Sequence, residues 1–287
     1  MLALTVVLAM LVGVSLGLLG GGGSILTIPL LAYVAGMAVD DAIATSLLVV
    51  GVTSVVGAVS HARAGRVRWR TGLLFGLAGT IGALAGGLVS RVVPDTVLLL
   101  AFAVMMIATA VGMLRGRRTA TRRSVPSTAT ILLLGVAVGL ITGLVGAGGG
   151  FLVVPALALL GGLPMPVAVG TSLVVIAMNT FAGFAGHLSA VSIDWPLAGA
   201  VTAAAVAGAL VGGRLTARVD SDALRKGFGW FVLAMASVVL AQELSPAVGI
   251  AAAVLVAVAA AMSWNCSRRP HCLVRRWAVR LRVPAHA

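Results

Sequence analysis

The residues of this chain that could do chemistry are two runs of glycine and the hydroxyl groups near them. The first run, Gly20 to Gly23, is followed by Ser24, and the second extends from Gly146 to Gly150 with one alanine inside it. Glycine can turn a chain between two half-helices because it adopts positive φ without a steric penalty. The half-helix after the turn directs free N–H groups and its positive dipole end at the turn, an arrangement that binds anions. The runs therefore indicate a small-anion site, with close helix packing through glycine as the alternative.

Hydroxyl and amide side chains follow each glycine run. Thr45 and Ser46 come after the first run, and Thr171 and Ser172 come after the second. Their hydroxyls could complete the shell of an anion, or each could bond back to a carbonyl one turn earlier in its own helix. Asn179 follows Thr171 and Ser172 on the same face of the expected helix. A buried amide in a span either joins two helices or contacts a ligand.

Two histidines, His61 and His187, end hydrophobic stretches. An imidazole titrates near neutral pH and could gate the protein or couple proton movement. Each ring could equally lie at the membrane interface and be satisfied by water. All seven acidic residues fall in expected loops or at the ends of expected spans, so a carboxylate proton relay is not predicted.

The candidate substrate-binding residues are the glycines, hydroxyls and amide of these stretches: Gly20, Gly21, Gly22, Gly23, Ser24, Thr45, Ser46, Gly146, Gly148, Gly149, Gly150, Thr171, Ser172 and Asn179. His61 and His187 are the candidates for proton coupling or gating. No catalytic residue, metal site or cofactor is predicted, because the sequence offers no nucleophile paired with a base and no cluster of metal ligands.

The elements that must position these residues are membrane-spanning helices. Hydrophobic residues make up 60% of the chain, charged residues make up 9%, and the mean hydropathy is +1.15. This composition is typical of an integral membrane protein. The net charge of +13 comes from arginines in short clusters between apolar runs and in the C-terminal tail, as in cytoplasmic loops. The lipid bilayer is therefore an expected partner, and nucleic acid is not.

The chain also repeats itself. Pro29, His61 and Trp69 recur 126 residues later as Pro155, His187 and Trp195. These residue types are rare in the sequence, so a duplication explains the matches better than coincidence.

The two repeats are predicted to be inverted, because Lys and Arg near span ends favour the cytoplasm. If each glycine run folds back, every Lys and Arg except Arg91 falls on the same side as the C-terminal tail. If each run crosses the membrane once, the basic residues divide almost evenly between the two sides.

The predicted fold is all-α and polytopic, with two inverted repeats that each contain a glycine-broken helix or hairpin, plus one terminal span. The predicted divisions are a first repeat (1–114), a basic cytoplasmic linker (115–126), a second repeat (127–242), an extra span (243–264) and a basic cytoplasmic tail (265–287).

These motifs also carry a family resemblance. Gly17-Leu-Leu-Gly-Gly-Gly-Gly-Ser-Ile-Leu-Thr-Ile-Pro29, its second copy from Gly143 to Pro155, and a Thr-Ser-Leu after each resemble the sulfite exporter TauE/SafE family, also described as 4-toluene sulfonate uptake permeases. The resemblance extends from Val12 to Glu243. It implies a polytopic permease of the bacterial inner membrane, with sulfite, sulfonates, sulfoacetate or other small organic anions as the substrate class.

We therefore expect a permease that moves a small, sulfur-containing or related anion by alternating access, with its C-terminus in the cytoplasm. A passive anion channel is the alternative within transport. An intramembrane enzyme or a membrane scaffold is the alternative of another class. The enzyme lacks candidate residues, the scaffold leaves the glycine runs unexplained, and homo-oligomerisation stays open.

The inverted arrangement can be checked by labelling. Single cysteines near Arg66 and near Ser189 occupy equivalent places in the two repeats, and they are expected to react with a membrane-impermeant thiol reagent from opposite sides. Labelling of both positions from the same side would show that the repeats are parallel.

Overall fold

The computed structural model describes residues 2–21, 24–90, 95–115, 127–145, 150–187, 193–216 and 218–243. The chain divides into two compact units, 1–232 and 233–287, and the packing discussed below lies within the first. Residues 116–126 of the predicted linker lie outside the described residues. The predicted basic tail and all of the predicted terminal span except residue 243 also lie outside them.

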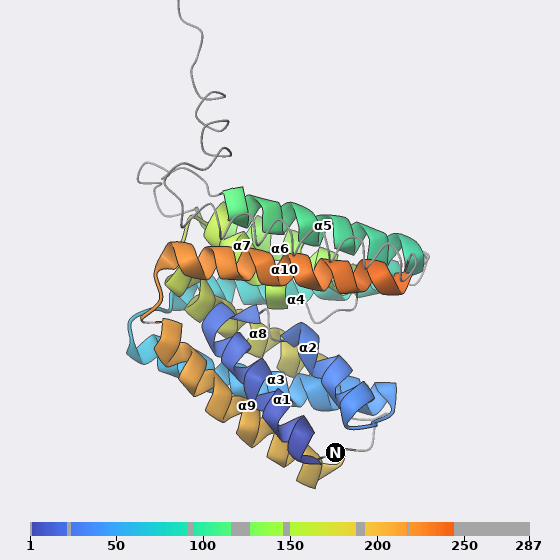
Figure 1. Ribbon diagram of the computed structural model, residues 1–287. Coiled ribbons are helices and arrows are strands. Elements are labelled where there is room, and N and C mark those ends of the chain that lie inside the picture. Colours follow the sequence, from blue (N-terminus) through green and yellow to red (C-terminus); the bar gives the residue numbers. More distant parts are fainter. Residues whose placement is uncertain are drawn as a thin grey trace, which may run out of the picture. The chain divides into compact units, whose positions relative to one another are not determined.

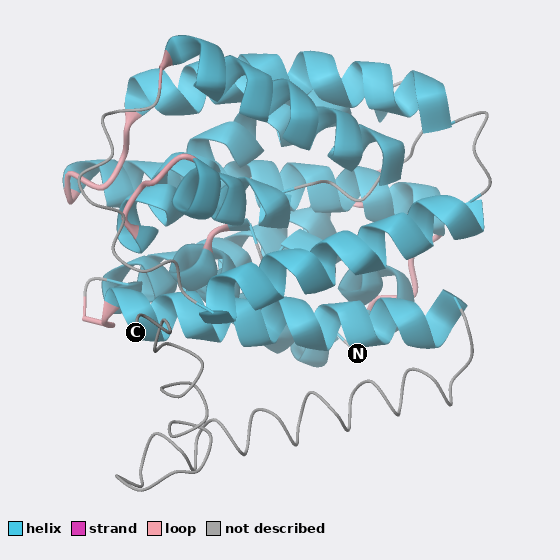
Figure 2. Cartoon of the chain, turned by 90° about the horizontal axis from the view of Figure 1, so that it is seen from above, coloured by secondary structure: helices cyan, strands magenta, loops and turns pink. Residues whose placement is uncertain are grey.

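All of the regular secondary structure in the described ranges is helical (Figure 2). The helices run in the order α1 (Leu2–Leu19), α2 (Ser24–Pro29), η2 (Leu30–Val34), α3 (Val39–Arg63), α4 (Trp69–Ser90), α5 (Asp95–Arg115), α6 (Thr128–Val145), α7 (Gly150–Pro155), η3 (Ala156–Leu160), α8 (Met165–His187), α9 (Trp195–Thr216) and α10 (Ser221–Glu243) (Figure 1).

Four helices are long and apolar enough to cross a bilayer by themselves. They cover Asp40–Arg63, Trp69–Val89, Met165–Ala185 and Trp195–Thr216. Shorter apolar helices cover Ala3–Leu19, Ala103–Arg115 and Thr128–Leu144. The prediction of a polytopic helical membrane protein is confirmed.

Each glycine run is followed by a short broken helix. Pro29 ends α2 and Pro155 ends α7, and in both places the helix continues as one turn of π-helix. Proline has no N–H and its ring crowds the preceding turn, so the normal hydrogen-bond ladder cannot continue through it. The wider π-turn follows directly. In both copies a glycine with positive φ comes two residues after the π-turn, Gly36 at 74° and Gly162 at 66°.

The first glycine run folds the chain back on itself. Leu30 and Leu31 of η2 belong to the same buried cluster as Ala9 and Val12 of α1, and α1 and η2 are in contact. A straight continuation of α1 would carry Leu30 about 27 Å beyond Val12, at 1.5 Å per residue. The stretch from α1 to η2 is therefore a hairpin and not one kinked span.

The two repeats pack through a pair of equivalent helix contacts. Helix α1 lies along α9, and α6 lies along α4 (Figure 1). A Cβ added at Gly13 of α1 would meet the carbonyl of Ala205 in α9, and one added at Gly139 of α6 would meet the carbonyl of Gly79 in α4. Each partner in one contact lies 126 residues from its counterpart in the other. Such a reciprocal exchange is what a two-fold relation between repeats produces.

Equivalent helices of the two repeats run in opposite directions. Gly51 of α3 lies against Thr180 and Phe181 of α8, and further along α3 Gly57 lies against Leu173. Residue numbers rise in one helix as they fall in the other, so α3 and α8 are antiparallel. Both helices are long enough to span the membrane, and opposite directions in equivalent spans are the geometry of inverted repeats.

The glycine contacts generate a stability prediction. The methyl group of a Gly13→Ala variant would collide with the Ala205 carbonyl and push α1 away from α9, with an expected loss of about 1–3 kcal/mol in unfolding free energy. The measurement is detergent-induced unfolding of the purified protein in mixed micelles.

Gly199→Ala in α9 is the matched control, because nothing lies within 4 Å of a Cβ at that helical glycine. It gains the same intrinsic helix propensity as Gly13→Ala without the collision. Equal stability of the two variants would contradict the backbone contact between α1 and α9.

Candidate functional site

The tip of the first hairpin is packed against the second repeat. Gly20 has φ of 72°, and a Cβ added there would lie 2.7 Å from Ser172 Oγ and 2.8 Å from Val154 Cγ2. Both glycine features predicted from the sequence, positive φ and close approach, therefore occur at this residue. The short helices α2 and α7 also contact each other. The structure thus brings Gly20 together with Ser172, two of the predicted site residues.

Several predicted glycines cannot be placed in this way. Gly22, Gly23 and the run from Gly146 to Gly149 lie outside the described residues. Gly21 is buried directly after Gly20, Ser24 begins α2, and Gly150 begins α7 as a buried residue.

The four predicted hydroxyls are buried, but they differ in their partners. Ser46 Oγ donates to the Ile43 carbonyl at 2.8 Å, and Ser172 Oγ donates to the Val169 carbonyl at 2.8 Å. Both serines thus bond back to their own helix. Thr171 Oγ1 instead accepts from the backbone N–H of Arg68 at 3.1 Å, and this contact joins α8 to the loop between α3 and α4.

Thr45 is the exception among these hydroxyls. Its side chain has no exposed surface, and its Oγ1 has no hydrogen-bond partner among the described residues. Thr27 of α2 and Thr53 and Ser54 of α3 are in the same condition. A buried hydroxyl without a partner is costly and calls for an explanation. These unpaired groups are spread along the first hairpin and the helix that follows it.

Asn179 is joined to another helix. Its Oδ1 accepts a hydrogen bond from Thr80 Oγ1 of α4 at 2.9 Å, and Thr80 also lies 3.0 Å from the carbonyl of Gly76. The amide is half-buried. Two roles were considered for Asn179, and this hydrogen bond supports the one in which the amide joins two helices.

His61 lies inside the protein and not at a surface. The ring is fully buried, and its Nε2 donates to the carbonyl of Gly17 in the last turn of α1 at 3.2 Å. The same carbonyl accepts from Thr216 Oγ1 of α9 at 3.1 Å. Because a carbonyl only accepts, Nε2 carries the proton, and Nδ1 has no partner among the described residues. His187 ends α8, but its side chain lies outside the described residues.

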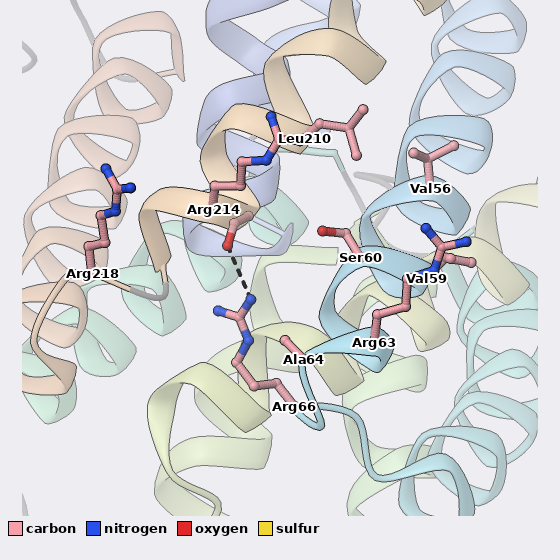
Figure 3. A pocket seen from close by; sticks show the side chains of 10 residues that line it. Val56, Val59, Ser60, Arg63, Ala64, Arg66, Leu210, Arg214 and Arg218 are labelled. Carbon is pink, nitrogen blue, oxygen red and sulfur yellow. Dashed lines mark hydrogen bonds between the residues drawn. The ribbon is translucent and has the colours of Figure 1, made fainter.

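A pocket lined by arginines opens beside His61. It has a volume of about 590 Å³, and its walls come from α3, the loop after α3, α9 and the loop after α9. Figure 3 shows its four basic residues, Arg63, Arg66, Arg214 and Arg218. None of the ten lining residues is acidic. Gly213 connects the pocket to the histidine, because a Cβ added at Gly213 would lie 3.4 Å from His61 Nε2.

Arg66 is held in place at this pocket. Its Nη2 donates to the carbonyl of Gly213 at 3.2 Å, and its Nε and Nη1 are buried without a partner among the described residues. Burial lowers the pKa of the Arg66 guanidinium below its ordinary value. An arginine nevertheless keeps its charge at neutral pH.

The sequence analysis missed this pocket. It treated the arginines as markers of the cytoplasmic side and did not consider them as ligands. One signal was available, because the counterparts of Arg63, Arg66, Arg214 and Arg218 in the other repeat are Ser189, Ser192, Leu88 and Val92. The four arginines are therefore not conserved between the repeats, and only one of the two equivalent places in the chain carries this cluster of positive charge.

The site residues that the structure describes are rich in hydrogen-bond donors. The described residues provide backbone turns, buried hydroxyls and guanidinium groups, all of which donate hydrogen bonds to oxyanions. No group of three His, Cys, Asp or Glu that could hold a metal ion occurs within the part of the chain that the structure describes.

The chain is similar to known membrane transporter proteins. The family described as "Sulfite exporter TauE/SafE" matches residues 5–239. A probable membrane transporter protein of Xylella fastidiosa (strain Temecula1) is 36% identical over 244 residues, which cover 80% of this chain and 91% of that protein. The probable membrane transporter protein YdhB of Bacillus subtilis is 26% identical over 219 residues, covering 74% of this chain and 89% of YdhB. No solved structure matches the chain significantly.

The contact between Thr80 and Asn179 can be tested with a double-mutant cycle. We expect Thr80→Val and Asn179→Leu each to destabilise the protein and to show a coupling energy of about 0.6 kcal/mol, the usual value for hydrogen bonds between membrane helices. The measurement is the unfolding free energy of both single variants and the double variant in mixed micelles. Strictly additive losses, together with lost substrate binding in Asn179→Leu alone, would assign the amide to a ligand instead.

Proposed function

Because the chain belongs to the sulfite exporter TauE/SafE family and is therefore a multi-pass membrane transporter, we propose that its cargo is a small anion. Within that class we favour an organic or inorganic sulfur oxyanion of the sulfite, sulfonate or sulfoacetate type. The cargo would bind where the two glycine hairpins meet and cross the membrane by alternating access.

The observation that carries this proposal is the position of Gly20. Its backbone approaches Ser172 so closely that no side chain fits between them, so the turn itself forms one wall of the site. Thr27 of α2, the helix that follows the turn, carries a buried hydroxyl without a partner in the described residues. An anion needs such donors, because it loses its water shell when it enters the membrane.

Two further features support an anion over a cation. Acidic residues lie at the ends of the described spans and not inside them, with Asp40 and Asp41 in the first turn of α3 and Asp222 in the first turn of α10. Cation sites within membranes are usually built on carboxylates. The donors near the hairpin, in contrast, are hydroxyl groups and backbone N–H groups.

The two-fold relation between the repeats supports alternating access over a passive channel. Inverted repeats can exchange conformations, so that a site at their interface opens first to one side and then to the other. We place the transporter in a bacterial inner membrane with the C-terminal tail in the cytoplasm, since the arginine clusters then lie on the side that basic loops favour.

The site is tested by a pair of alanine variants. Gly20→Ala places a methyl group against Ser172 and Val154 and is expected to abolish anion flux into proteoliposomes. Gly36→Ala is the matched control, because Gly36 has nearly the same positive φ but open space around it. Both variants should insert and purify as the wild type does. Full flux through Gly20→Ala, or equal loss in Gly36→Ala, would rule out the hairpin tip as the substrate site.

The cargo is tested with a panel of sulfite, sulfonates, sulfoacetate and carboxylates, each with and without a pH gradient. Saturable flux of sulfur oxyanions with competition among them is the expected result. A rate that rises linearly with concentration would favour the channel. Dependence on the pH gradient, lost in His61→Gln, would add proton coupling to the mechanism.

A further inference from the structure

The arginine pocket is a site that the transport proposal does not use. It lies at the ends of α3 and α9, whereas the proposed cargo site lies at the hairpin tip formed by Gly20 and Ser172. We propose that this pocket is a second, separate binding site for an oxyanion, with Arg66 as its central ligand. The chemistry is that of a sulfonate, sulfate or phosphate group carrying several acceptor oxygens.

The state of Arg66 is the first argument. One guanidinium nitrogen donates to the Gly213 carbonyl, and this bond fixes the plane of the group (Figure 3). The other two nitrogens are buried and have no acceptor in the described residues. Proteins rarely leave buried donors of a charged group unpaired. A planar guanidinium with a fixed orientation and unused N–H groups is suited to pair with the oxygens of an oxyanion.

The charge of the surroundings is the second argument. Arg63, Arg214 and Arg218 line the same pocket, and no lining residue is acidic. Four guanidinium groups around one cavity repel one another unless an anion lies among them. A bound oxyanion would relieve that repulsion and supply the acceptors that Arg66 lacks.

The shape of the pocket is the third argument. Its volume of about 590 Å³ is within the range of small-ligand sites. Val56, Val59 and Leu210 line the part of the wall formed by the helices, away from the loops that carry Arg66 and Arg218. The pocket can therefore hold an anion with a charged head and a short apolar body as well as an inorganic anion. The head group of an anionic lipid has the same chemistry.

The sequence of the other repeat is the fourth argument. The equivalent corner carries Ser189, Ser192, Leu88 and Val92 in place of the four arginines. Arginines that serve only to direct membrane insertion need to lie on the cytoplasmic side, but they do not need to line the same cavity. The arginines therefore mark one side of the transporter as the side at which oxyanions are collected.

The experiment measures binding and not transport, with the full-length protein in nanodiscs of phosphatidylcholine. Calorimetric titration with sulfate, methanesulfonate and benzenesulfonate is expected to show saturable binding. Arg66→Gln and Arg214→Gln should each weaken it about tenfold, the cost of one charged hydrogen-bonding partner. Arg66→Lys should recover part of the affinity, because it keeps the charge and loses the planar fork.

Arg68→Gln is the matched control. Arg68 lies in the same loop as Arg66 and carries the same charge, but its side chain does not line the pocket. Its dissociation constant for the anion should stay within about twofold of the wild-type value, a difference of a few tenths of a kcal/mol in binding free energy. An equal loss in Arg68→Gln and Arg66→Gln would reduce the effect to general electrostatics and overturn the proposal.

Two further arms separate the alternatives. In nanodiscs that contain phosphatidylglycerol, native mass spectrometry reports retained lipid. Lipid retention that Arg66→Gln abolishes, without binding of soluble anions, would assign the pocket to a lipid head group. Gly20→Ala should lose only the anion binding at the hairpin and keep the binding that Arg66→Gln weakens. If it loses binding while Arg66→Gln does not, the bound anion lies at the hairpin and the second site is refuted. Binding in the absence of any flux would leave this site intact and remove the transport proposal.

Discussion

The structure depends on direct contact between helix backbones at glycine. Within a bilayer the hydrophobic effect does not draw helices together, so they associate where small residues allow close packing. Gly13 and Gly17 of α1 meet the backbone of α9, and Gly139 and Gly143 of α6 meet the backbone of α4. These two contacts join the repeats to each other. The first hairpin begins at the end of α1, which is held in this way, so the position of Gly20 follows from the glycine contacts.

The contacts also explain how a polar turn persists among apolar helices. The last turn of α1 is fixed from two sides, because the Gly17 carbonyl accepts hydrogen bonds from His61 of α3 and Thr216 of α9. Three residues later the chain turns at Gly20, against Ser172. Irregular backbone is tolerated at membrane depth only where protein surrounds it. Helices α3, α8 and α9 provide those surroundings for the first hairpin.

Much of this fold could be predicted from the sequence. The spans followed from hydropathy, and the duplication from the recurrence of Pro29, His61 and Trp69. The inverted relation followed from the distribution of basic residues, and the antiparallel packing of α3 and α8 has the geometry it requires. The hairpin followed from the same distribution, because the basic residues gather on one side only if each glycine run folds back. The π-turns after Pro29 and Pro155 were not predicted, since a proline alone does not reveal how its helix adjusts.

The site was harder to predict, because its properties depend on partners far apart in the sequence. Nothing local distinguishes Thr45 from Thr171, yet only Thr171 receives a hydrogen bond, from the backbone of Arg68. His61 was considered as an interfacial residue and lies buried, because Gly170 of α8 and Gly213 of α9 leave room around it. The arginine pocket joins residues about 150 positions apart, such as Arg63 and Arg214. The pattern of charges along the sequence does not reveal that arginines so far apart line the same pocket.

The pairing of α1 with α9 also has a consequence for biosynthesis. Helix α1 is translated before its partner, which begins only at Trp195. At the usual rate of synthesis, the nascent α1 resides in the membrane for on the order of ten seconds before α9 exists. During that time its glycine face has no partner, and α1 must remain inserted through its own hydrophobicity. The apolar sequence of Leu2–Leu19 favours lipid over water, although α1 is shorter than the four helices that can cross a bilayer by themselves.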